Sequence, residues 1–181
     1  MYEKGELVIY GSVGVCRIED ITTPDFCAQS GKDDLYYVLS PLFQSGMIYA
    51  PVESKKIFMR PVISRKEADE LIDMIPRIRV EAYHNRSTQL LVAHYEKAFE
   101  SHSCADLVEL IMSIYSKKQS LAQQRRKFGN IDSRFMKRAE DMLYGELSVV
   151  YGIEPEQVQS FIASRVADAE SAAVFASQEE E

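Results

Sequence analysis

The sequence predicts an α+β protein of two domains, with a small antiparallel β domain first and a helical domain second. Up to about residue 61, short runs of Val, Ile, Tyr and Phe alternate with Gly, Pro, Ser and Asp, which is typical of strands joined by tight turns. After Pro61 the apolar residues recur every three or four positions, as on the buried face of a helix. Because strands and helices are segregated along the chain, a wound parallel sheet is disfavoured.

Five segments of the first domain are expected to form strands: residues 6–10, 13–21, 35–40, 46–51 and 56–61. Pro51 and Pro61 fall at the ends of the last two segments, where a missing N–H group disturbs a sheet least. Five short strands in about sixty residues predict a small antiparallel barrel or curled sheet. We place this domain at residues 1–62.

An all-α bundle of about five helices is expected at residues 63–175. The first helix begins at Ser64, because Ser64 and Glu67 have the spacing of a capping box, and Pro76 ends it. Four more are expected from about residues 87 to 100, from 103 through 121, from 130 or 132 to about 150, and from 155 onwards. In the second helix, the residues predicted near one side are Leu90, Leu91, Ala93, His94, Ala98 and Phe99. Residues 176–181 are expected to form a frayed acidic tail.

The composition is that of an ordinary globular protein. The chain has 181 residues, of which 46% are hydrophobic and 27% charged, so it is long enough to bury one large core or two small ones. No segment approaches the apolar length of a membrane span or a signal peptide. Cys16, Cys27 and Cys104 are odd in number and widely spaced. We therefore expect free thiols and a cytoplasmic monomer with no membrane partner.

Nothing in the sequence predicts an enzyme. His84, His94 and His102 lie in no HExxH or CxxC context, so a metal site is not expected. Cys16 lies within an apolar β segment and is more readily explained as a small buried residue than as a nucleophile. The glycines of "GSVG" at residues 11–14 lack the Lys and the helix that a phosphate loop requires. The sequence therefore indicates no catalytic residue and no cofactor.

Positive charge is concentrated in one stretch of an acidic chain. The net charge of the chain is −7, yet residues 116–138 contain eight Lys or Arg and one carboxylate, Asp132, for a net +7. The eight cations are Lys117, Lys118, Arg125, Arg126, Lys127, Arg134, Lys137 and Arg138. The first five are predicted at the end of one helix, and the last three share a face of the next. A tight turn at 128–132 is expected to bring the two groups onto one surface.

Two interpretations of this surface remain open from the residues alone. In one it contacts phosphates of a nucleic acid. In the other it is a solvated face that pairs with acidic residues near the C-terminus. Those residues are Glu154, Glu156, Asp168 and Glu170.

Four segments together resemble the CarD-like transcription regulators, whose N-terminal domain is shared with the transcription-repair coupling factor. "EKGELVIYGSVGVCRIEDI" (3–21) is similar to the family's opening strands, with Gly11 and Ser12 where Pro and His are usual. "DDLYYVLSPLFQSGMIYAPVES" (33–54) is similar to its Y-x-V-L strand and hairpin. "RAEDMLYGELSVVYGI" (138–153) resembles its A-x-x-x-L-x-x-E-L signature, and "NRSTQLLVAHYEKAFES" (85–101) occupies the place of its N-W-S-R-R helix start.

The resemblance implies a bacterial transcription regulator with a Tudor/SH3-like N-terminal barrel. One edge of that barrel is expected to pair with a strand of the RNA polymerase β subunit, a case of β-augmentation. The strand that maps there contains Met47, Ile48, Tyr49, Ala50 and Pro51.

The resemblance further implies that the helical domain contacts promoter DNA, where family members use a Trp as a wedge. This chain has no Trp, and Arg86 occupies that position, followed by Thr88 and Gln89 in place of an Arg pair. The residues expected to contact DNA are Asn85, Arg86, Arg125, Arg126, Lys127, Arg134, Lys137 and Arg138. The alternative is a protein-interaction module that binds RNA polymerase or another protein without touching DNA.

Overall fold

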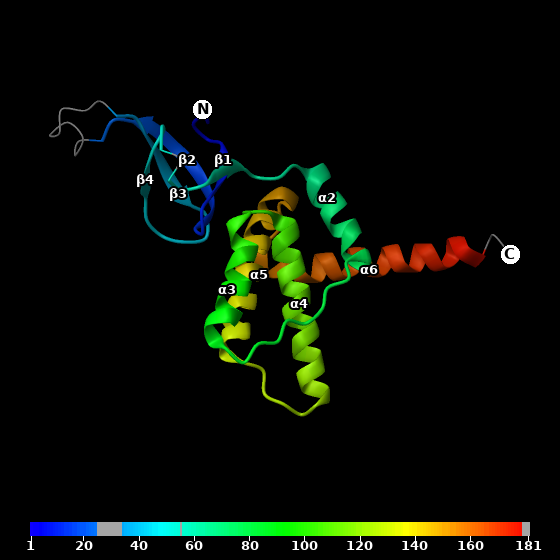
Figure 1. Cartoon of the computed structure of the whole chain (residues 1–181). Helices are drawn as coiled ribbons and strands as arrows, with labels where there is room; N and C mark the ends of the chain where they lie inside the picture. Colours follow the sequence, from blue (N-terminus) through cyan, green and yellow to red (C-terminus); the bar gives the residue numbers. More distant parts are fainter. Residues whose placement is uncertain (25–33, 55, 179–181) are drawn as a thin grey trace. The chain divides into compact units, whose positions relative to one another are not determined.

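The computed structural model describes residues 1–24, 34–54 and 56–178, and side chains as far as residue 168 (Figure 1). The chain divides into two compact units, Met1–Ile63 and Ser64–Glu181. The first contains a five-stranded sheet and the second contains helices, so the predicted α+β layout in two parts is confirmed.

The N-terminal unit is an antiparallel sheet in the order β4-β3-β2-β1-β5. Its strands are β1 (Leu7–Tyr10), β2 (Gly14–Thr22), β3 (Tyr36–Pro41), β4 (Ile48–Pro51) and β5 (Met59–Pro61). All five predicted strands are present. The predicted barrel is not confirmed, because β4 and β5 lie at opposite ends of the strand order and, among the described residues, the sheet is not closed.

One face of this sheet carries the core of the unit. Its buried members are Val8, Tyr10, Cys16, Ile18, Tyr37, Leu39 and Ala50. Burial raises the pKa of the Cys16 thiol to about 11, so this cysteine behaves as a small apolar residue at neutral pH. Cys104, in the helical unit, is also buried, whereas Cys27 lies outside the described residues.

The helical unit contains five α-helices and one short 3₁₀ helix in its described part. They are α2 (Arg65–Met74), η1 (Ile75–Arg77), α3 (Thr88–Glu100), α4 (Cys104–Gln123), α5 (Asn130–Tyr151) and α6 (Pro155–Gln178). The capping box of Ser64 and Glu67 is present, with both reciprocal hydrogen bonds. Pro76 lies in η1, which follows α2 directly. The backbone of α6 is helical through 178, and residues 179–181 lie outside the described part. None of the helices among the described residues is long and apolar enough to cross a membrane.

The bundle core is built where α3, α4 and α5 pack together. Tyr95 of α3 is fully buried, with its ring centroid 5.3 Å from that of Phe135 on α5. The predicted apolar side is wrong at Leu90, Ala93 and His94, which are exposed, Leu90 to 57%. The buried residues of α3 are Leu91, Tyr95 and Phe99, one helical turn apart.

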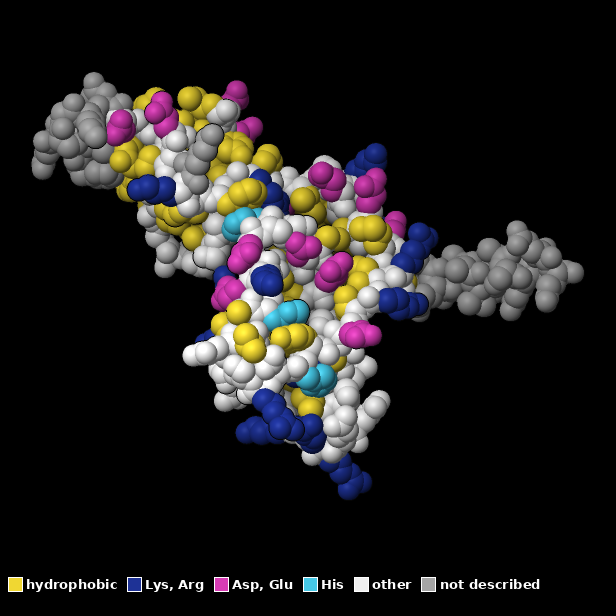
Figure 2. Space-filling model, in the orientation of Figure 1, with side chains coloured by type: hydrophobic (Ala, Val, Ile, Leu, Met, Phe, Trp, Pro, Cys, Tyr) yellow, Lys and Arg dark blue, Asp and Glu magenta, His cyan; other side chains and the backbone are white. Residues whose placement is uncertain are grey.

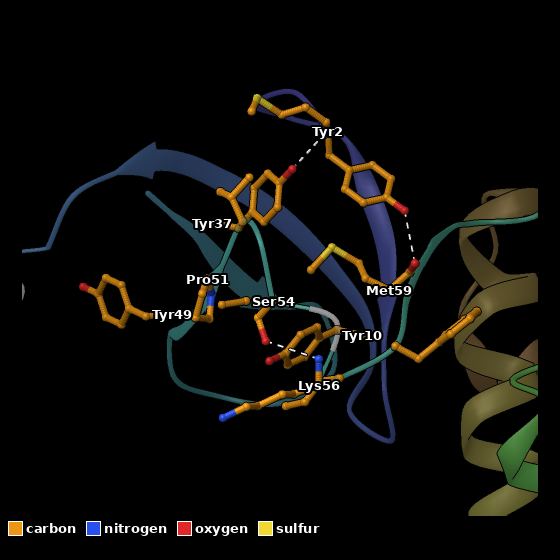
Figure 3. Close-up of a pocket in the computed structure, with 13 residues that line it drawn as sticks. Tyr2, Tyr10, Tyr37, Tyr49, Pro51, Ser54, Lys56 and Met59 are labelled. Atoms are coloured by element: carbon orange, nitrogen blue, oxygen red, sulfur yellow. Dashed lines mark hydrogen bonds between the residues drawn. The ribbon is translucent and has the colours of Figure 1, made fainter. Parts of the chain in front are cut away.

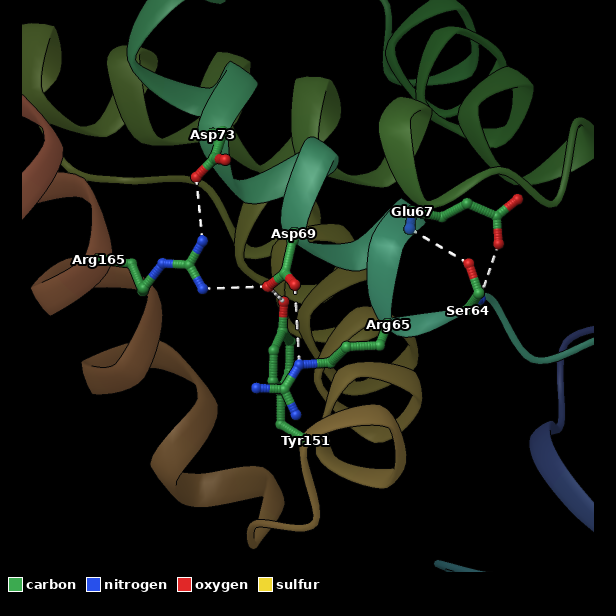
Figure 4. Close-up of polar contacts among 7 residues, drawn as sticks. All are labelled: Ser64, Arg65, Glu67, Asp69, Asp73, Tyr151 and Arg165. Atoms are coloured by element: carbon green, nitrogen blue, oxygen red, sulfur yellow. Dashed lines mark hydrogen bonds and ion pairs between the residues drawn. The ribbon is translucent and has the colours of Figure 1, made fainter.

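A polar cluster joins α2 to the end of α5 and to α6 (Figure 4). Asp69 on α2 accepts a hydrogen bond from the Tyr151 hydroxyl at 2.8 Å and one from Arg165 at 3.0 Å. Arg165 also reaches Asp73 at 3.1 Å, and the Arg65 guanidinium lies 4.3 Å from the centroid of the Tyr151 ring. These contacts fix α6 against α2.

The Asp69 cluster makes stability depend on pH in a defined direction. The Tyr151 hydrogen bond and then Arg165 hold the pKa of Asp69 below its ordinary value of 3.8. A carboxyl group whose pKa is lower in the folded state stabilises the protein above its unfolded pKa, and this contribution is lost as the pH falls through the folded value. We expect Asp69→Asn to lower the free energy of unfolding at pH 7. In denaturant titrations, the difference from the parent should shrink below about pH 4; a difference of constant size down to pH 2 would contradict this.

Candidate functional site

Strand β4 is an edge of the sheet, and its register defines which backbone groups face outwards. Leu39 pairs with Ile48 and Val38 with Tyr49, while the N–H of Val52 donates to the Leu35 carbonyl at 2.9 Å. In an antiparallel ladder, pairs that exchange hydrogen bonds alternate with pairs that do not. Ile48 and Ala50 therefore bond to β3, whereas the backbone N–H of Tyr49 points towards the outer edge.

The side chains around this edge are apolar and exposed. Phe43, Met47 and Tyr49 are each about half exposed, at 49%, 53% and 47%. Ala50, also predicted to bind the partner, has a buried side chain, so only its backbone lies near the surface. An edge strand bordered by large exposed apolar groups is suited to adding a strand from another protein.

A cavity of about 1020 Å³ lies beside β4 and is lined by residues of both end strands (Figure 3). Tyr2 spans it, because its backbone N–H donates to the Tyr37 hydroxyl at 3.1 Å and its own hydroxyl donates to the Met59 carbonyl at 3.2 Å. Among the described residues that line it, Lys56 has the one charged side chain, and Tyr49 points away from the other labelled tyrosines. The described lining of this cavity is therefore largely apolar and contains no carboxylate.

The second candidate surface lies at one end of the helical unit. Helices α3, α4 and α5 follow one another through short connections, so the start of α3, the end of α4 and the start of α5 meet at the same end (Figure 1). Figure 2 shows Lys and Arg side chains gathered there. The segments that carry the predicted DNA-binding residues from Asn85 to Arg134 thus lie at the same end of the unit, although they are distant in sequence.

Several cations at this end have no anionic partner inside the protein. In the described part of the chain, the side chains of Arg86, Arg125, Arg126 and Lys127 are exposed and form no hydrogen bond or ion pair. Arg134 is exposed and contacts only the Phe135 ring, at 5.3 Å. Arg125 to Lys127 follow α4, which ends at Gln123, so their predicted position within its last turn is wrong. Unpaired, exposed cations are available to an anionic ligand.

Three other cations of the basic stretch are neutralised internally. Lys137 pairs with Asp141 one turn along α5, and Arg138 holds both oxygens of Glu96 at 3.0 Å while lying 4.0 Å from the Phe99 ring centroid. Lys117 is buried, which contradicts its expected place on the basic surface. The alternative pairing with acidic residues near the C-terminus is limited to one longer-range interaction, since Glu154, Glu156 and Asp168 form no ion pair with the stretch but, after the hydrogen bond to Asp141, the charge of Glu156 contributes to the raised pKa of Lys137. The side chain of Glu170 lies outside the described part.

The partner of Lys117 is Asp132, the only carboxylate of the stretch. Its Oδ1 lies 2.8 Å from Lys117 Nζ, and both side chains are less than one-tenth exposed. The Tyr95 hydroxyl donates to the same Oδ1 at 2.7 Å, and burial with this hydrogen bond raises the pKa of Tyr95. No local sequence pattern predicts this trio, because its members are separated by 15 to 37 positions.

Near Arg86 the chain is fixed by local contacts. Asn85 donates to the Tyr83 hydroxyl at 3.1 Å and accepts from the Ser87 N–H at 2.8 Å. The Tyr83 ring is stacked on His94 with centroids 3.7 Å apart. One face of the Tyr83 ring is therefore covered by His94, and Arg86 extends from a segment held by these contacts.

The described residues thus provide two candidate binding surfaces, an exposed apolar sheet edge and the basic end of the helical unit. Residues 2–63 match the CarD-like/TRCF RID domain. The N-terminal unit is thus a domain of this RNA-polymerase-interacting kind, and the match supports a transcription-related interaction with RNA polymerase. No curated protein matches the chain significantly.

Proposed function

We propose that this protein is a bacterial, CarD-like transcription regulator that binds the RNA polymerase β subunit through its N-terminal unit and promoter DNA through its helical unit. The match of residues 2–63 to the RNA-polymerase-interacting domain carries the first half of the proposal. The exposed, unpaired cations at one end of the helical unit support the second half. The protein acts as a cytoplasmic monomer in this proposal, without catalysis or a cofactor.

Docking on the polymerase uses the outer edge of β4 at residues 47–51. The β subunit contributes a strand that pairs with this edge through backbone hydrogen bonds. These backbone bonds supply the affinity, and the side chains determine which strand is selected. Met47 and Tyr49 flank the added strand with exposed apolar surface. A Tudor-like barrel with a gap between β4 and β5 would present this edge in the same way.

DNA contact is made by Arg125, Arg126, Lys127 and Arg134, with Arg86 at the neighbouring helix start. Each cation placed at a phosphate releases a counterion, which favours binding at low salt. The net charge of −7 for the whole chain opposes binding by the free protein. Docking on the polymerase overcomes this opposition, because it raises the local concentration of DNA at the basic end.

The test is to remove charge at the proposed contact. The triple variant Arg125→Gln, Arg126→Gln, Lys127→Gln should bind promoter DNA within the polymerase complex about a hundredfold more weakly at low salt. Its plot of log affinity against log salt should flatten by about two to three units, at 0.9 per lost phosphate contact. Affinity for polymerase alone should be unchanged.

Lys137→Gln is the matched control, because it removes a cation of the same stretch that is already paired with Asp141. It should leave both the affinity and the slope nearly unaltered. If the triple variant also behaves like the parent, the helical unit does not touch DNA and the protein is a module for protein contacts alone.

A further inference from the structure

The turn between α4 and α5 holds a conformation that its own residues do not favour. Arg125 has φ +54°, in the left-handed region where glycine is the preferred residue at the end of a helix. Its N–H donates to the Ala122 carbonyl at 3.0 Å, and the N–H of Arg126 donates to the Leu121 carbonyl at 2.8 Å. These are the two hydrogen bonds of a Schellman cap. An arginine thus stands where a glycine would fit with less strain.

A strained residue keeps its conformation only where the surroundings hold it. Here the two helices that enter and leave the turn are tied together by the ion pair of Lys117 and Asp132. Tyr95 adds α3 to the same point, since its hydroxyl lies 2.7 Å from Asp132 Oδ1 and 3.4 Å from Lys117 Nζ. Three helices are therefore joined directly beneath the basic turn.

The last residue of the turn, Gly129, is packed against the side chain of Asp132. A Cβ atom at this position would lie 2.8 Å from Asp132 Oδ2. That distance is shorter than a van der Waals contact, so a larger residue would displace the carboxylate. The turn and the ion pair are thus packed against each other.

The ion pair adds no charge to the surface above it. Lys117 and Asp132 neutralise each other and are both buried. Any effect of this pair on a ligand must therefore pass through the geometry of the turn, because the exposed cations Arg125, Arg126 and Lys127 are separate groups.

We propose that Tyr95, Lys117 and Asp132 are positioning residues that hold the α4–α5 turn as a preorganised binding site for the phosphates of DNA. This inference rests on the proposed DNA contact. A fixed array of cations binds phosphates with less loss of conformational freedom than a mobile basic loop carrying the same charge. The left-handed backbone conformation of Arg125 costs stability, and in return the turn carries a guanidinium group at this position.

The test is to remove the ion pair while leaving every exposed cation in place. In the double variant Lys117→Met, Asp132→Asn both new side chains are uncharged. The amide oxygen of the new asparagine can still accept a hydrogen bond from the Tyr95 hydroxyl. We expect the double variant to remain folded by circular dichroism, to bind promoter DNA in the polymerase complex about tenfold more weakly, and to show a flatter salt dependence. Amide hydrogen exchange at residues 124–129 should become faster.

The matched control is Asp69→Asn. Asp69 also accepts hydrogen bonds from a tyrosine and a cation, but its tyrosine, Tyr151, is at the opposite end of α5 from Asp132. This variant should leave DNA affinity and salt dependence at their parental values. A folded double variant that binds DNA like the parent would overturn the positioning role.

A second substitution, Arg125→Gly, gives a readout that does not depend on the double variant folding. Glycine relieves the left-handed strain, so the Tm should rise, while the lost guanidinium should weaken DNA binding about three- to tenfold. A lower Tm or unchanged DNA binding would show that the turn is not held under strain for this contact. Failure of the parental protein to contact DNA at all would instead refute the proposed function.

Discussion

Tyr49→Pro is expected to abolish binding of the protein to RNA polymerase without unfolding the N-terminal unit. The Tyr49 N–H faces the outer edge of β4, whereas the flanking Ile48 and Ala50 bond to β3. Proline removes the outward donor and places its ring where the partner strand would lie, which prevents a strand from being added there. A pull-down with RNA polymerase measures the effect directly.

Two controls separate this effect from the loss of an aromatic side chain or of the sheet. Tyr49→Ala keeps the backbone donor and should reduce binding only modestly. Ile48→Pro should impair the sheet itself, because it removes a hydrogen bond to Leu39. Wild-type affinity in a Tyr49→Pro protein with a native circular dichroism spectrum would rule out β4 as the docking edge.

Lys117→Met should destabilise the protein by about 3–5 kcal/mol, the largest stability effect expected of any change in the basic stretch. It leaves the carboxylate of Asp132 buried without a counter-charge, and Tyr95 alone cannot replace the ammonium group. Urea titration monitored by circular dichroism gives the free energy of unfolding.

The neutral pair Lys117→Met, Asp132→Asn should recover most of the lost stability, because no buried charge then remains unpaired. A double-mutant cycle built from the two single variants and the double therefore yields a large coupling energy. If the Lys117→Met protein lies within about 1 kcal/mol of the parent, the ion pair does not stabilise the junction of α3, α4 and α5.

Much of the fold was predictable because its signals are local. The five strands were found from their composition and turns, and the capping box at Ser64 marked the start of α2. Closure of the sheet was not predictable in this way, since it depends on the pairing of β4 with β5, which no local pattern specifies. Tyr95 was missed as a core residue because a tyrosine at a helical position is equally compatible with the surface.

The candidate site was predictable as a region and less so residue by residue. The charge of residues 116–138 identified the basic end, but sequence spacing cannot show which cations find partners on other helices. Arg138 forms an ion pair with Glu96, and Lys117 forms one with Asp132. In both cases the partner lies on another helix, so it depends on how the helices pack. Unpaired charge is a property of tertiary structure.

The strand order of the N-terminal unit has a consequence for how the protein folds. Strand β5 pairs with β1, so Tyr10 meets Met59, and the sheet is completed only when the two ends of the unit come together. Pairings between distant residues form slowly, because the chain must lose the entropy of a long loop before any contact compensates for it. The α3–α4–α5 part of the helical unit, by contrast, is built from neighbours in sequence and can form early. On refolding from denaturant, we therefore expect the sheet to be completed more slowly than this helical part, and during synthesis it cannot be completed before the chain has reached Pro61.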